Sequence, residues 1–152
     1  MTTKLTKLPK GLKIGLLSFP FCGNLEDLKD EIAILGIPYG LPYYPNEFAN
    51  GQSLTPYLIR QNAQDSALYE PRTIKLFDWD LGGDLLNGSN ICVVDCGNVT
   101  SDIRTPGEHY NRAEKAMKKI FESAKTLVNI DADGLESTIM QAVNSPTPGG
   151  LN

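Results

Sequence analysis

Residues 31–38 read Glu-Ile-Ala-Ile-Leu-Gly-Ile-Pro, a nearly continuous apolar run that ends at a proline. A run of this length without alternation is typical of a parallel strand that is buried on both faces of its sheet. Residues 91–96, Ile-Cys-Val-Val-Asp-Cys, have the same character, and a third apolar run ends at Ile130. The three runs predict a sheet at the centre of the molecule.

Two helices are predicted between these strands. The first spans residues 55–64, because Thr-Pro is a typical helix start. The second spans residues 106–125 and opens with a capping box formed by Thr105 and Glu108. The alternation of strands and helices indicates an α/β fold, which binds ligands at the carboxyl ends of its strands. One face of the second helix is apolar, as expected of a core-facing stripe, and carries Tyr110, Ala113, Met117, Ile120, Phe121 and Ala124.

Composition narrows the class of protein. The chain has 152 residues, the size of one domain, with 41% hydrophobic and 21% charged residues. A net charge of −4 and the lack of a basic run argue against nucleic acid, and no apolar run approaches a membrane span. The three cysteines form no disulfide framework, and we expect Cys92 and Cys96 to be buried thiols in a reducing compartment. These features predict a cytoplasmic protein without a signal peptide.

The third apolar run leads into Asp131 and Asp133, which alternate with small or apolar residues. In a strand, two residues at this spacing project from the same face. Paired carboxylates suit a divalent cation such as Mn²⁺. The alternative is a polar strand end that runs into a solvated turn.

Other polar residues are expected to play no chemical role. His109, in the first turn of the second helix, is predicted to be a solvated surface residue. Asp78, Asp80 and Asp84 lack calcium-loop spacing and predict a solvated acidic loop. Asp95 is expected to end its strand and to hydrogen-bond the following turn.

Four segments in the same order resemble the ureohydrolase family, and in particular its agmatinase-like members. They are residues 34–40, 78–83, 93–98 and 129–133, so that the resemblance covers nearly the whole chain. The last segment, Asn-Ile-Asp-Ala-Asp, is the most specific, since with Gly150 it is similar to the family's C-terminal metal signature.

The resemblance implies a three-layer, arginase-like α/β fold with a parallel sheet flanked by helices. It also implies a two-manganese centre, with Asp131 and Asp133 as metal ligands and with oligomeric assembly. In such a centre a metal-bridged hydroxide attacks a guanidinium carbon and releases urea. The implied activity is hydrolysis of a guanidino compound, such as agmatine, to an amine and urea in polyamine metabolism. Residues 39–50 resemble the family's substrate-side loop, but the resemblance assigns no individual catalytic or substrate-binding residue.

The sequence departs from the family at its centre. The family motifs Gly-Gly-Asp-His and Asp-Ala-His-x-Asp, which supply most metal ligands, do not occur. We therefore expect residues 1–152 to form a single partial domain, with roughly a hundred residues missing near 123–126. Such a chain would be an inactive, truncated hydrolase, and its exposed strand edges would favour low stability or oligomerisation. The alternative is a non-catalytic module that docks on a full-length ureohydrolase subunit.

Overall fold

The computed structural model describes residues 4–12, 15–39, 51–65, 77–80, 82–84, 91–100, 105 and 107–130. Three short 3₁₀ turns accompany the regular elements, namely η1 (Leu16–Ser18), η2 (Leu25–Asp27) and η3 (Gly51–Leu54). The strands are β1 (Thr6–Lys7), β2 (Ile32–Gly36), β3 (Phe77–Asp78), β4 (Gly83–Asp84), β5 (Val93–Val99) and β6 (Thr126–Ile130). The helices are α1 (Thr55–Asp65) and α2 (Gly107–Phe121).

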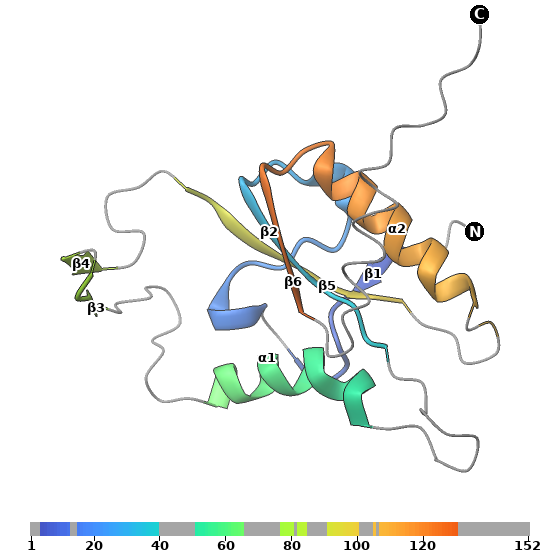
Figure 1. The fold of residues 1–152 in the computed structure, drawn as a ribbon, viewed down its shortest axis with the longest axis horizontal. Coiled ribbons are helices and arrows are strands. Elements are labelled where there is room, and N and C mark those ends of the chain that lie inside the picture. Colours follow the sequence, from blue (N-terminus) through green and yellow to red (C-terminus); the bar gives the residue numbers. More distant parts are fainter. Residues whose placement is uncertain are drawn as a thin grey trace, which may run out of the picture.

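A four-stranded sheet organises the fold, with strand order β1-β5-β2-β6 (Figure 1). Strand β2 runs parallel to both β5 and β6, whereas β1 pairs with β5 in the antiparallel sense. The sheet is therefore mixed, and the prediction of an all-parallel sheet was wrong for β1. An antiparallel edge strand is common on such sheets, because a short edge strand needs no crossover helix. The coarse α/β class is confirmed.

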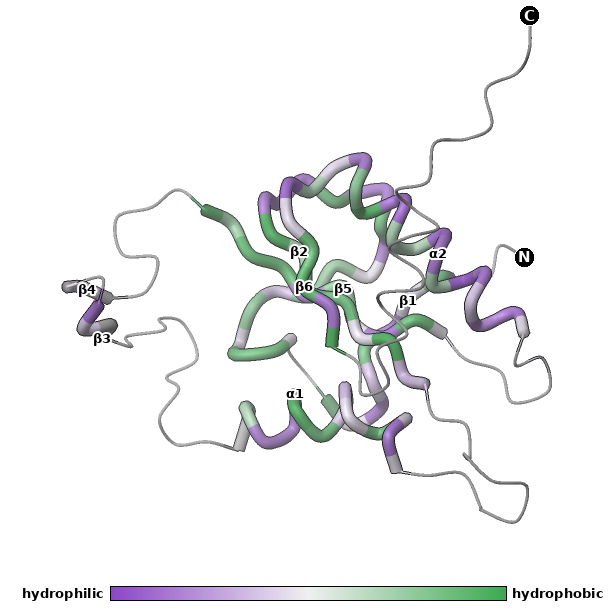
Figure 2. Tube along the Cα trace, viewed as in Figure 1, coloured by the Kyte–Doolittle hydropathy of each residue, from purple (hydrophilic) through white to green (hydrophobic). Residues whose placement is uncertain are grey.

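Strand β2 confirms the interpretation of residues 31–38. Ala33 and Leu35 are fully buried, and the strand has a parallel neighbour on each side. Figure 2 shows the hydrophobic character of β2 and β5 at the centre of the molecule. Strand β5 begins two residues later than the predicted strand and continues past it to Val99. Cys96 is accordingly buried, but Cys92 precedes the strand and is exposed, so its predicted burial was wrong.

A bulge in β5 changes which side chains share a face. Two residues of β2, Ile34 and Gly36, pair with Asp95 and Asn98, so β5 carries one extra residue between these pairs. Gly97 supplies the bulge with a φ of 75°, a value that favours glycine. Asp95 and Asn98 thereby project from the same face of the sheet, although they are three residues apart.

The opposite face of the sheet is covered by α2, which confirms the second predicted helix, although α2 ends at Phe121 and not at residue 125. The inward side of α2 is formed by Ala113, Ala116, Met117 and Ile120, all fully buried, with Ala124 just after its end. Tyr110 and Phe121 are each 37% exposed, so their assignment to the core stripe was wrong. The helix is rotated so that His109 and Ala116 take the inward positions instead. His109 is only 4% exposed, which also contradicts its predicted place on the solvated surface.

Helix α1 confirms the helix predicted over residues 55–64 and belongs to the other face of the sheet. Residues 77–84, expected to be part of an acidic loop, contain the antiparallel pair β3–β4, with Asp80 exposed in the connecting turn. Among the described helices, none is long and apolar enough to cross a bilayer.

Candidate functional site

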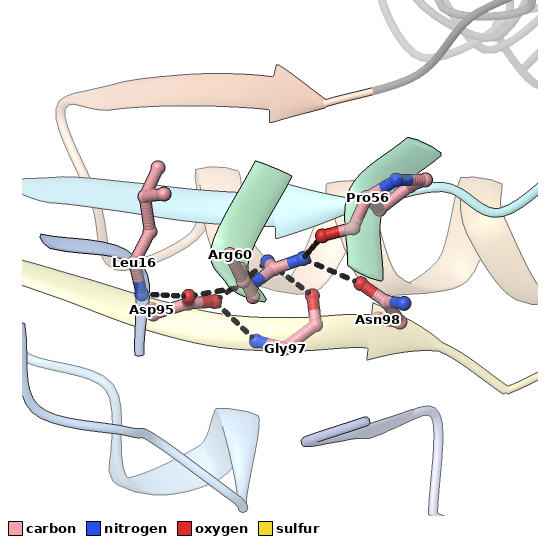
Figure 3. Close-up of polar contacts among 6 residues, drawn as sticks. All are labelled: Leu16, Pro56, Arg60, Asp95, Gly97 and Asn98. Atoms are coloured by element: carbon pink, nitrogen blue, oxygen red, sulfur yellow. Dashed lines mark hydrogen bonds and ion pairs between the residues drawn. The ribbon is translucent and has the colours of Figure 1, made fainter. Parts of the chain in front are cut away.

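Arg60 is the centre of the most extensive polar network in the described structure (Figure 3). It lies one turn after Pro56 on α1 and is fully buried. Its Nε donates to Asp95 Oδ2 at 2.7 Å and its Nη2 donates to Asp95 Oδ1 at 2.8 Å, a bidentate ion pair. Nη1 donates to the Pro56 carbonyl at 3.0 Å and to Asn98 Oδ1 at 2.7 Å, and Nη2 also donates to the Gly97 carbonyl at 3.3 Å. All five N–H donors of the guanidinium are thus used.

Asp95 is equally well satisfied. Besides Arg60, its Oδ1 accepts from the Gly97 amide at 2.7 Å and its Oδ2 accepts from the Leu16 amide at 2.7 Å. Directly after Leu16, Leu17 and Ser18 have positive φ values of 51° and 65°. This backbone conformation is costly for a bulky residue, and it occurs where the chain directs an amide at a buried carboxylate.

The predicted role of Asp95 is only partly correct. Its carboxylate does bond the backbone two residues on, at Gly97. However, Asp95 lies within β5 instead of at its end, and it is fully buried. Sequence reasoning missed its partner Arg60, and it also missed the role of Asn98. No local signal in the sequence identifies these roles, because Asp95 and Asn98 lie 35 and 38 residues from Arg60 along the chain.

The arrangement around Arg60 is suited to holding elements together. A buried charge is tolerated when it is paired and every remaining hydrogen-bonding group is satisfied. Here both conditions hold, and no donor of Arg60 is left for a ligand. The network joins α1, β5 and the segment at Leu16, which are distant in sequence.

The carboxyl ends of three parallel strands meet beside this network. Gly36 of β2 pairs with Asn98 of β5 on one side and with Ile130 of β6 on the other. The Ile37 amide donates to the Ile130 carbonyl at 3.0 Å, which extends the pairing to the end of β6. Asp131 follows Ile130 in the sequence. Asp131 and Asp133 themselves lie outside the described residues, so their predicted metal site stays a prediction.

A second polar cluster lies on the α2 side of the sheet. The rings of Tyr39 and His109 stack at a centroid distance of 6.1 Å, and the Tyr110 hydroxyl donates to the Tyr39 hydroxyl at 2.6 Å. Burial lowers the pKa of His109, as does the Arg112 cation, whereas the Thr100 backbone acts in the opposite direction. Neither ring nitrogen of His109 makes a hydrogen bond within the described structure. The cluster therefore places a buried imidazole, whose pKa is lowered, against the ring of Tyr39.

Metal-ligand geometry is not assembled in the described residues: no three His, Cys, Asp or Glu side chains gather there. Cys22 is partly buried, Cys92 is exposed and Cys96 is buried. Burial raises the pKa of the Cys96 thiol to about 12, which favours its protonated form.

No protein-family model and no curated protein matches this chain.

Proposed function

We propose that this chain is a non-hydrolytic, agmatinase-like ureohydrolase domain that binds Mn²⁺ through Asp131 and Asp133. The observation that carries the proposal is the parallel pairing of β6 with β2. This pairing brings the carboxyl end of β6 to the same edge as those of β2 and β5. Ligands of α/β sheets bind at this edge, and Asp131 follows β6 directly in the sequence.

The small number of candidate ligands favours binding without turnover. Two carboxylates hold a divalent ion weakly, and the family's central ligand motifs are missing from the sequence. Arg60, which bonds Asn98 at the end of β5, is fully engaged with Asp95, Asn98 and backbone carbonyls, so it offers no further donor to a substrate. A guanidino compound such as agmatine is therefore the substrate that the family resemblance implies. We expect this chain to release no urea from it.

Thermal unfolding with and without millimolar Mn²⁺ tests this proposal. A ligand that binds only the folded state raises its stability by about 1.4 kcal/mol at ten times its Kd. For a domain of this size we expect a rise of a few degrees in Tm. The double variant D131N/D133N should lose the rise, and D80N, which changes an exposed aspartate in the β3–β4 turn, should keep it.

Two results would contradict the proposal. If Mn²⁺ leaves the Tm of the natural sequence unchanged, then Asp131 and Asp133 form no metal site. If agmatine yields urea with Mn²⁺ and D131N/D133N abolishes that reaction, then the chain is an active hydrolase.

A second candidate function is docking on a full-length ureohydrolase subunit. The observation that favours it is the position of β6, which is the last strand of the described sheet and exposes 45% of Val128. Co-expression with an intact ureohydrolase and recovery of a stable complex of the two chains would support this function. If the two chains separate during purification, docking is excluded for that subunit.

A further inference from the structure

Cys22 and Cys96 lie side by side, at the point where a segment that precedes β2 runs along strand β5. Phe21 of this segment pairs with Asp95 of β5 in the parallel sense. Two backbone hydrogen bonds hold the pairing. The Asp95 amide donates to the Pro20 carbonyl at 2.9 Å, and the Cys22 amide donates to the Asp95 carbonyl at 2.9 Å. Each cysteine follows a paired residue, so the two cysteines occupy neighbouring positions on the two segments.

Both cysteine side chains belong to the face of the sheet that α2 covers. Asp95 points to the other face, toward Arg60, and successive side chains of a strand alternate between faces. Cys96 is accordingly part of the buried core that includes Met117 of α2, and Cys22 packs against the same core. Neighbouring strands lie about 4.8 Å apart, and a disulfide spans Cα separations of about 4.4–6.8 Å. The backbone therefore has the spacing that a disulfide between Cys22 and Cys96 needs.

The two thiols differ in their access to solvent. Cys22 is partly buried and lines a surface pocket of about 360 Å³, together with Pro20, Asn24 and Val94. Its Sγ donates to the Asn24 carbonyl at 3.1 Å in an exposed contact. Cys96, in contrast, is fully buried. A reagent in the pocket therefore meets Cys22 first, and Cys96 is placed to attack only the sulfur of Cys22.

We propose that Cys22 and Cys96 are a modification site, at which a small-molecule disulfide such as oxidised glutathione forms a reversible disulfide within the protein. The Cys22 thiolate attacks one sulfur of the reagent, which gives a mixed disulfide and releases one reduced glutathione. Cys96 then loses its proton and attacks the Cys22 sulfur, so the protein disulfide forms and the second reduced glutathione leaves. Two protein thiols are oxidised, one small disulfide is reduced, and the two protons of the protein thiols end on the two glutathione thiols.

The surroundings of the thiols make this exchange slow. Burial raises the pKa of Cys22 and of Cys96, so only a small fraction of either thiol is ionised at neutral pH. The thiolate that does form is a stronger nucleophile, because nucleophilicity rises with pKa. The second step also joins two groups that the fold holds together, which raises their effective concentration. We therefore expect the disulfide to form over minutes to hours, the range of uncatalysed disulfide exchange.

Thiol mapping of the full chain tests the site. The protein is incubated with excess oxidised glutathione in EDTA, the remaining thiols are capped, and the digested chain is analysed by mass spectrometry. We expect a linked peptide pair that contains Cys22 and Cys96 and that separates on treatment with dithiothreitol. C92S is the matched control, because Cys92 is exposed and lies outside the pair, and it should form the same disulfide. C22S should form no disulfide within the chain. A linkage through Cys92, or capping of both Cys22 and Cys96 after prolonged oxidation, would overturn the proposal.

Thermal unfolding gives a second readout of the same disulfide. A disulfide restricts the unfolded chain, so the oxidised natural sequence should melt several degrees above its form reduced with dithiothreitol. C92S should show the same rise and C22S should show none. An oxidised protein that melts at or below the reduced form would overturn the proposal, because the bond would then distort the fold. The inference goes beyond the proposed function, since EDTA removes Mn²⁺ and neither measurement involves Asp131 or Asp133.

Discussion

Arg60 and Asp95 are both withdrawn from water, yet each makes every hydrogen bond available to it. Taking two charges out of water costs several kcal/mol per ion, and their attraction repays this cost only with good geometry and further hydrogen bonds. The main effect of the ion pair is therefore to fix the position of α1 on the sheet, and its net contribution to stability is small. Removal of one partner is a different matter, because the other charge then remains buried and unpaired.

We expect R60M and D95L each to lower the free energy of unfolding by about 3–5 kcal/mol. The double variant R60M/D95L should be much less unstable than the sum of the two, because no lone charge remains. Urea denaturation of the four proteins measures this coupling. As a control, K118M breaks the exposed pair with Glu114 and should cost less than about 1 kcal/mol. Additive effects of R60M and D95L would show that the two side chains do not act as a pair.

His109 makes stability depend on pH. Its pKa is lowered in the folded state by burial and by Arg112, so the unfolded chain binds more protons in mildly acidic solution. Stability is then complete above the unfolded pKa of about 6.5 and falls as the pH drops below it. We expect the Tm of the natural sequence to decrease between pH 7 and pH 5. H109F, which keeps a ring against Tyr39, should show a smaller decrease, and an unchanged slope would refute this role.

At the scale of elements, the bulge in β5 explains a requirement for glycine in β2. Gly36 pairs with Asn98, and a Cβ at position 36 would overlap the Asn98 side chain and lie 2.8 Å from Arg60 Nη1. The strand therefore passes close beneath the Arg60 network only because residue 36 has no side chain.

We expect G36A to lower the free energy of unfolding by about 1–3 kcal/mol, as overpacking does in a well-packed interior. G51A is the matched control, since a Cβ at position 51 would meet no atom within 4 Å. Chemical denaturation of both variants measures the difference. A G36A variant as stable as G51A would show that the network shifts without cost.

The helices and central strands were predictable because their signals are local. The apolar run in β2, the Thr-Pro start of α1 and the Thr105–Glu108 start of α2 each occur within a few residues. The face of α2 that packs on the sheet was not fully predictable from the helix sequence. Ala116 is buried and Tyr110 is exposed because of how the helix is rotated against the sheet, and this rotation depends on residues outside the helix. The bulge at Gly97 lies within β5, and the strand continues to Val99, so Asp95 does not end the strand, although its carboxylate does bond the backbone two residues on.

At the scale of the whole molecule, sequence reasoning predicted the class of fold and missed how distant segments meet. Strand β1 has two residues, too few for any periodic pattern, and its antiparallel pairing depends on Val99 and Asn98. Arginine side chains are usually exposed, and the burial of Arg60 depends on its ion pair with Asp95, which is distant in the sequence. The candidate metal ligands Asp131 and Asp133 lie outside the described residues, so that part of the site rests on the sequence alone.

The strand order has a consequence for synthesis of the chain. Strand β2 emerges from the ribosome early, but β5, its first partner, begins about 60 residues later, or roughly 3–12 s at 5–20 residues per second. During this interval neither of the described strands that pair with β2 has been synthesised. Nascent chains that stall between Gly36 and Val93 should therefore expose an apolar segment and aggregate easily. We expect chaperones to bind these nascent chains at β2.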